Sequence, residues 1–158
     1  MKKTAWIILL MLLTAGWMLL IFGFSAQSGE ESGGLSAIIA EPLTELLVRF
    51  SGGIKASARE ALYLQVDSVV RTAAHFTEYA ILGALLALIW RCFGLEKIWL
   101  PMLSGAVYAL TDEWHQAYIP GRSCEFKDLL VDTGGVICGV LMIAYLIQIW
   151  RKKHVQHS

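Results

Sequence analysis

Apolar residues occur along the chain in four long runs that are separated by polar segments. The first run, residues 4–24, carries no charged side chain. It is about 21 residues long, and about 20 apolar residues in a helix span the roughly 30 Å hydrocarbon core of a bilayer. The other runs cover residues 73–90, 98–117 and 129–150. The pattern therefore predicts four membrane-spanning helices.

The first run also resembles the core of a secretory signal peptide, because Lys2 and Lys3 precede it. It is longer than such a core, and Phe24 stands where signal peptidase requires a small residue. We therefore expect a retained anchor helix.

Residues 25–72 predict an extracytoplasmic helical insert between the first two runs. Residues 25–34 are polar and rich in Gly and Ser, which predicts a turn. Residues 35–50 place apolar side chains at helical spacing and charged ones on the other face, so they predict an amphipathic helix that Pro42 kinks or interrupts. This helix either lies at the membrane surface or caps the helix bundle. Residues 56–71 predict a second amphipathic stretch that continues into the second span.

Composition agrees with a membrane protein. Of the 158 residues, 56% are hydrophobic and 16% charged, against roughly 25% charged in soluble domains. A soluble protein of this size could not bury so much apolar surface. The predicted fold class is all-α: a single domain, residues 1–158, that forms an integral membrane bundle of four transmembrane helices with an amphipathic extracytoplasmic segment.

Basic residues set the expected orientation, since Lys and Arg are enriched in short cytoplasmic loops. With the N-terminus inside, one face collects Lys2, Lys3, Arg91, Lys97 and Arg151 to Lys153. We expect a multi-pass protein of the cytoplasmic membrane with both termini in the cytoplasm.

Charge and cysteine content argue against several kinds of site. The formal net charge is zero and no basic stripe is present, so we expect no nucleic-acid partner. The expected partners are membrane lipids. Cys92, Cys124 and Cys138 lack zinc or redox spacing and fall at different predicted depths, so we expect free thiols. The sequence leaves the oligomeric state open.

Ionisable side chains gather at the predicted outer ends of the last three spans. Arg71, His75 and Glu78 share one face of the second helix, at i, i+4 and i+7. A charge in the bilayer centre costs at least about 2.5–3.5 kcal/mol, so such groups usually face the bundle interior and mark a site. The other members of the predicted cluster are Asp112, Glu113, His115, Gln116, Arg122, Lys127, Asp128 and Asp132.

The leading hypothesis is a pocket for an anionic lipid or a lipid-linked sugar. Two arginines would hold phosphate through bidentate hydrogen bonds, and neighbouring acids and histidines would supply acid–base chemistry if the protein is an enzyme, which stays open. The candidate ligand-binding residues are Gln27, Arg71, Tyr79, Gln116, Arg122, Asp128 and Asp132. The candidate catalytic residues are His75, Glu78, Asp112, Glu113 and His115.

Three alternatives remain. No cofactor is predicted, but a divalent metal could be held by His75, Glu78, Asp112 and His115, although no helical His-Glu-x-x-His motif is present. The cluster could relay protons or a solute within an oligomer. It could also only lock the helices together, with Arg71, Arg122 and Lys127 neutralising the carboxylates.

Four motifs in order resemble the VanZ-like membrane proteins. They cover almost the whole chain: Phe24-Ser25-Ala26-Gln27-Ser28; Arg71-x-x-x-His75-Phe76-x-x-Tyr79-x-x-Leu82-Gly83; Asp112-Glu113-x-His115-Gln116-x-x-x-Pro120-Gly121-Arg122; and Asp128-x-x-x-Asp132-x-x-Gly135-x-x-x-Gly139. Asp132 departs from the family, which often carries Asn there, and residues 35–65 match no motif.

The resemblance implies a role in the bacterial cell envelope. The family's named member is associated with resistance to the glycopeptide antibiotic teicoplanin, and its biochemical activity is not settled. A lipid-linked cell-wall intermediate or a glycolipid is therefore the implied ligand, and a link to antibiotic resistance is implied more weakly.

Overall fold

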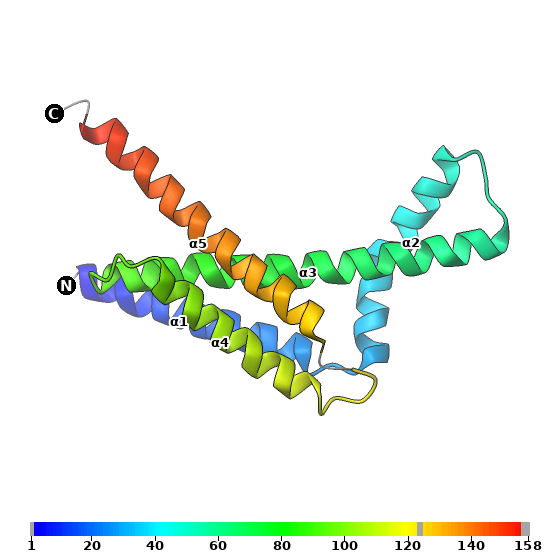
Figure 1. Ribbon diagram of the computed structural model, residues 1–158, viewed down its shortest axis with the longest axis horizontal. Coiled ribbons are helices and arrows are strands. Elements are labelled where there is room, and N and C mark those ends of the chain that lie inside the picture. Colours follow the sequence, from blue (N-terminus) through cyan, green and yellow to red (C-terminus); the bar gives the residue numbers. More distant parts are fainter. Residues whose placement is uncertain (1, 123–124, 156–158) are drawn as a thin grey trace.

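The computed structural model describes residues 2–122 and 125–155. In these two ranges the chain forms five helices and no strand, which confirms the all-α prediction (Figure 1). The helices are α1 (Lys2–Ser25), α2 (Gly29–Phe50), α3 (Ala56–Cys92), α4 (Trp99–Gln116) and α5 (Phe126–Val155).

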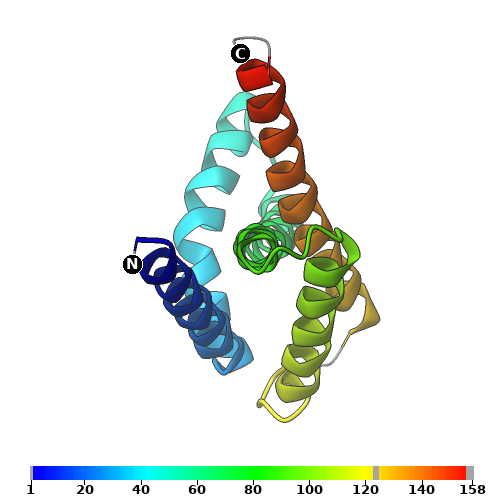
Figure 2. The ribbon, with the colours of Figure 1, turned by 90° about the vertical axis from the view of Figure 1, so that its left-hand side faces the viewer.

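Helix α3 is the centre of the molecule. It contacts each of the other four helices, most extensively α5, and Figure 2 shows it end-on between α1, α4 and α5. Its 37 residues correspond to about 55 Å at 1.5 Å per residue, well beyond the roughly 30 Å of a bilayer core. Helix α2 packs against the extension, so α2 and the first half of α3 form a projecting hairpin (Figure 1).

The turn predicted at residues 25–34 is wrong in its extent, because α2 already begins at Gly29. Ser28 caps the helix: its hydroxyl accepts the Glu31 N–H at 3.2 Å, and the Glu31 carboxylate accepts the Ser28 N–H at 2.9 Å. This reciprocal capping box outweighs the glycines that follow it. Pro42 does not interrupt α2 either, which is continuous to Phe50.

Helix α2 packs through small residues. Ser36, Ala40 and Thr44 are buried, whereas large apolar residues of the amphipathic pattern are turned outward, with Ile38 70% and Phe50 83% exposed. Small side chains let two helix backbones approach closely where lipid provides no hydrophobic drive. The apolar stripe of α2 therefore does not cap the bundle.

Among residues 2–122 and 125–155, three helices are long and apolar enough to cross a membrane: Lys3–Ser25, Ala56–Cys92 and Phe126–Lys153. Helix α4 lies where the remaining span was expected, but its 18 residues end in Asp112, Glu113 and further polar residues that lower its apolar character. A fourth span therefore stays a prediction.

The bundle buries charged side chains and exposes many large apolar ones. Asp112, Glu113 and Asp132 are at most 2% exposed, whereas Leu12 is 65% and Leu103 55% exposed. In water this arrangement would be unfavourable, since buried charges cost free energy and exposed leucines gain none. An apolar solvent favours it, which identifies the chain as a membrane protein.

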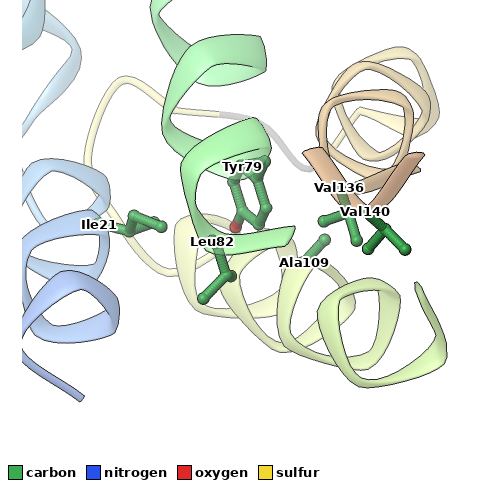
Figure 3. Close-up of a cluster of buried hydrophobic side chains, with 6 residues drawn as sticks. All are labelled: Ile21, Tyr79, Leu82, Ala109, Val136 and Val140. Carbon is green, nitrogen blue, oxygen red and sulfur yellow. The ribbon is translucent and has the colours of Figure 1, made fainter. Parts of the chain in front are cut away.

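A small apolar core joins four helices (Figure 3). Tyr79 lies at its centre, and its hydroxyl donates to Asp112 at 3.0 Å, so the core adjoins the buried polar groups directly. The members of the core are Ile21 of α1, Tyr79 and Leu82 of α3, Ala109 of α4, and Val136 and Val140 of α5.

Glycines let α3 and α5 touch through their backbones. A Cβ atom at Gly139 would collide with the carbonyl of Ala80, and one at Gly83 with the carbonyl of Val136. Gly105 of α4 likewise faces the side chain of Val136. The small residues that recur four apart in the sequence therefore lie at the helix contacts, as expected for membrane helices.

These contacts predict a position-specific effect on stability. Gly139→Ala should lower the free energy of unfolding by about 1–3 kcal/mol, because the added methyl group must separate α3 from α5. The matched control is Gly134→Ala on the same helix, where the nearest atom, in Phe76, is 3.9 Å from the new methyl. Thermal unfolding in detergent measures the difference, and equal stability of the two variants would contradict the packing.

The capping box predicts a pH dependence. Hydrogen bonds from the backbone N–H and the hydroxyl of Ser28 lower the pKa of the Glu31 carboxyl below its ordinary value. A lowered pKa stabilises the fold above the unfolded-state pKa, and the contribution is lost as pH falls through the folded-state value. The stability difference between wild type and Glu31→Gln should therefore shrink from about pH 5 to about pH 3. A difference that does not vary with pH would contradict this assignment.

Candidate functional site

Four helix ends meet at one end of the bundle, which we call the polar end: α1 and α4 finish there, and α2 and α5 begin there (Figure 1). The Gly29 N–H donates to the carbonyl of Pro120 at 3.1 Å and so joins the α1–α2 turn to the α4–α5 loop. A side chain at Gly29 would collide with the carbonyl of Gly121, which itself has φ +75°. The two glycines therefore hold these segments together.

Asp112 is the hydrogen-bonding centre of the polar end. Its Oδ2 accepts the Ser25 hydroxyl at 2.6 Å, the Tyr79 hydroxyl at 3.0 Å and the Gln116 amide at 3.2 Å. These donors tie α1, α3 and α4 to one carboxylate. Ser25 belongs to the Phe24 to Ser28 motif. Its burial at 2% exposure could not be read from the sequence.

Arg122 joins the α4–α5 loop to α1 and α4. Its guanidinium donates to the carbonyl of Phe24, the carbonyl of Gln27 and the side-chain oxygen of Gln116, each at 3.3 Å. In residues 2–122 and 125–155 it forms no ion pair, contrary to the hypothesis that it neutralises a carboxylate. Burial first, and then the charge of Arg71, lower the pKa of Arg122. Two neighbouring cations here would both be stabilised by an anion.

Arg71 is positioned by residues that the sequence hypothesis missed. Its Nε lies 3.2 Å from Asp67 Oδ2, one helical turn earlier, and 3.4 Å from the Ser36 hydroxyl of α2. Ser36 also donates directly to Asp67. The i, i+4 spacing of Asp67 and Arg71 is a signal in the sequence, but the contribution of α2 depends on tertiary packing.

His75 and Asp132 form the deepest charged contact. The Nδ1 atom of His75 lies 3.5 Å from Asp132 Oδ1, which is within ion-pair distance but longer than an ordinary hydrogen bond. Asp132 is fully buried, and neither of its carboxylate oxygens has a hydrogen-bond partner among the described residues. His75 Nδ1 is buried while 22% of the side chain is exposed. The exposed part of the imidazole therefore faces open space.

That space is a cavity of about 280 Å³, which we call the polar cavity. Three cations and two acids line it, so the lining has a small excess of positive charge. Its charged and titratable lining residues are Arg71, His75, Arg122, Glu125, Lys127 and Asp128, and Ser32, Ser68, Thr72 and Gln116 add further polar groups.

An apolar groove continues from the polar cavity. Its first part, about 190 Å³, shares four lining residues with the cavity: Ser32, Arg71, His75 and Arg122. Its second part, about 420 Å³, shares Ile39, Val70, Ala74 and Glu78 with the first. The groove ends beside Trp17 of α1 and Ile81 of α3, both on helices long enough to cross a membrane.

The structure brings most, but not all, of the predicted residues to this site. Gln27 and Glu78 line the groove. Tyr79 and Asp112 lie behind it as hydrogen-bonding support. Asp128 and Gln116 line the cavity, and Asp132 lies beneath His75.

Two predicted catalytic residues lie outside the cavity lining. His115 stacks on the ring of Phe22, with centroids 4.3 Å apart. Glu113 accepts the backbone N–H of Glu125 at 3.1 Å. Neither lines the polar cavity or the groove. Closeness to Asp112 in the sequence therefore does not bring either side chain to the cavity, and the catalytic roles of His115 and Glu113 stay predictions.

The metal hypothesis gains no support from the geometry. Within the described ranges, no three His, Cys, Asp or Glu side chains come together in a way that could hold a metal ion. The suggested ligands His75, Glu78, Asp112 and His115 are therefore not gathered at one point. Asp112 is instead occupied by three hydrogen-bond donors.

Comparison with known proteins agrees with the motifs. No curated protein and no solved structure matches the chain. A family model described as VanZ/LLP1 matches residues 8–149, which is most of the chain and includes every helix that contributes to the polar end. The chain therefore belongs to the VanZ/LLP1 family.

Proposed function

We propose that this membrane protein binds an anionic, lipid-linked ligand, with the head group in the polar cavity and the hydrocarbon chain in the apolar groove. One observation supports the proposal above all others: the cavity and the groove share a wall that contains Arg71, His75 and Arg122. A ligand with a charged end and an apolar chain complements that arrangement. A soluble anion would leave the groove unused.

The charges favour a phosphorylated head group with hydroxyl groups. Arg71, Arg122 and Lys127 can donate to phosphate oxygens through charge-assisted hydrogen bonds. Asp128 and Glu125 line the same cavity and can accept hydrogen bonds from sugar hydroxyls. A lipid-linked sugar phosphate or a glycolipid therefore fits better than a bare phosphate.

The surface of α4 supports a fourth span in this proposal. Leu103, Val107, Leu110 and Trp114 are all more than half exposed and form one apolar stripe along the helix. Asp112, Glu113 and Gln116 of α4 are buried instead. We infer that α4 crosses the bilayer with its stripe towards lipid.

With four spans, the distribution of Lys and Arg supports a topology in which both termini lie in the cytoplasm and the polar end lies outside. The ligand would then be a molecule of the bacterial cell envelope. A role in glycopeptide resistance further requires that the ligand be a cell-wall intermediate. Binding measurements with defined lipids would identify the ligand.

The binding proposal predicts an effect of Lys127. This residue lines the cavity and forms no ion pair among the described residues, so Lys127→Gln removes a cation without a structural partner. Affinity for a polyprenyl phosphate, measured on the detergent-purified protein, should fall about tenfold, as the loss of one charged hydrogen bond implies. Lys153→Gln, at the other end of α5, is the matched control and should bind like wild type.

A neighbouring pair of glycines provides an independent comparison. A methyl group at Gly33 would lie 2.8 Å from Arg71 Nη2, whereas nothing lies within 4 Å at Gly34. Gly33→Ala should displace the guanidinium and weaken binding, and Gly34→Ala should not. Equal affinity in all four variants, or equal binding of the uncharged polyprenol, would contradict the proposal.

A second candidate function is hydrolysis of the bound ligand, and the His75–Asp132 contact favours it. A carboxylate that orients an imidazole leaves Nε2 free to act as a general base. In a phosphomonoester, Nε2 would take a proton from water while the water oxygen bonds to phosphorus. The bond from phosphorus to the lipid oxygen breaks, and that oxygen takes the proton from the imidazolium. The products are the lipid alcohol and inorganic phosphate.

Release of inorganic phosphate from a polyprenyl phosphate tests the hydrolase proposal. Asp132→Asn preserves the side-chain shape but cannot stabilise an imidazolium, so turnover should fall at least about a hundredfold, with little change in affinity. His75→Gln should behave alike. Absence of phosphate release by a wild-type protein that binds the lipid would exclude hydrolysis of this substrate and leave binding as the function.

A further inference from the structure

A second cavity, about 300 Å³ in volume, lies at the end of the bundle opposite the polar end. We call it the basal cavity. It is formed by the end of α3, the α3–α4 turn and the second half of α5. The sequence predicts the basic residues of this region only as signals of orientation. None of the residues that line the basal cavity lines the polar cavity or the groove, so the two sites are independent.

A tight turn creates one side of the basal cavity. After α3 the chain reverses at Gly94, whose φ of +78° favours glycine. The Gly94 N–H donates to Arg91 O at 2.9 Å, and the Leu95 N–H donates to Trp90 O at 3.0 Å. This pattern of helix termination returns the chain beside the last turn of α3. Glu96 is thereby placed next to Arg91.

Three cations and one carboxylate line the basal cavity. Glu96 Oε1 lies 3.3 Å from Arg91 Nη1 and 2.8 Å from Arg151 Nη2 of α5, so a single oxygen serves two guanidinium groups. Each guanidinium has five N–H donors, and these contacts involve one nitrogen on each. Lys97 lines the same cavity. Donors and positive charge therefore exceed what the carboxylate satisfies.

The remaining wall is apolar and belongs to the spans. Ile143 and Ile147 lie on α5, within Phe126–Lys153, and Ile98 closes the wall at the start of α4. The cations thus lie where two candidate spans end, at the depth of lipid head groups. An inorganic anion would contact only the charged side of this cavity, whereas a phospholipid would occupy both sides.

We propose that the basal cavity binds an anionic phospholipid, with its phosphate between Arg91 and Arg151 and an acyl chain against Ile98, Ile143 and Ile147. Two arginines that flank one phosphate suit its oxygens through paired N–H donors. Glu96 holds the two arginines at that spacing before the lipid arrives. A lipid bound there would contact both α3, through Arg91, and α5, through Arg151.

Native mass spectrometry of the full-length protein tests the proposal, with phosphatidylglycerol and phosphatidylcholine of equal chain length as probes. Wild type should retain phosphatidylglycerol preferentially. The double variant Arg91→Gln/Arg151→Gln should bind it at least about tenfold more weakly. The control Lys152→Gln/Lys153→Gln removes the same charge from the same end without touching the cavity lining and should bind like wild type.

A cavity-filling variant keeps the test decisive if the arginine variant does not fold. Ala144 lines the cavity, so Ala144→Leu should reduce lipid retention with every charge intact. Thermal unfolding in a neutral detergent checks the fold of each variant. Equal retention of both lipids, equal losses in the arginine and lysine variants, or displacement of the lipid by glycerol phosphate would each overturn the proposal.

Discussion

The direct backbone contact between α3 and α5 determines the rest of the structure. Gly135 and Gly139 of α5 lie against the carbonyls of Phe76 and Ala80, where no side chain would fit. One turn before Gly135, the same contact brings Asp132 beside His75. Helices held farther apart would separate that pair and widen the cavity above it. The arrangement of the site therefore depends on the packing of these glycines, because the close approach of the two backbones brings the Asp132 carboxylate beside the His75 imidazole.

The second constraint is polarity, which is reversed relative to a soluble bundle. Polar side chains such as Asp112 tie the helices together inside, and leucines face outward. A buried carboxylate with three donors is a strong restraint in an apolar surrounding, since each unmade hydrogen bond would cost free energy. The charged residues therefore serve two purposes at the polar end. Some lock the helices, and others line a cavity that opens beside them.

Much of the fold could be predicted from hydrophobic periodicity. The runs at residues 4–24, 73–90 and 129–150 all lie within helices, because length and apolar content suffice to identify a span. The early start of α2 was missed, although Ser28 and Glu31 carry a recognisable capping signature. The outward turn of α2's large apolar residues could not be predicted, since the same periodicity fits either face.

The candidate site was predictable in its location and less so in its membership. Arg71 and His75 share a helix face, so their convergence follows from the helix period. The parts played by Ser25, Ser32 and Ser36 depend on tertiary packing, because the sequence does not show which neighbour a serine on a helix will face. His115 was grouped with Asp112 by closeness in sequence, yet it stacks on α1 instead. The position of a residue in the sequence therefore predicts its depth along a helix well, but it predicts poorly which neighbouring helix its side chain faces.

The central claim is that one amphipathic ligand occupies the polar cavity and the apolar groove together. Photolabelling with a polyprenyl phosphate that carries a diazirine in its chain tests this most directly, because it identifies the contacted segments by mass spectrometry. The account predicts labels around Trp17 of α1 and Ile81 of α3, which line the far part of the groove, and competition by unlabelled polyprenyl phosphate. Labels confined to the outward faces of α4 and α5, or labels unaffected by competitor, would contradict it.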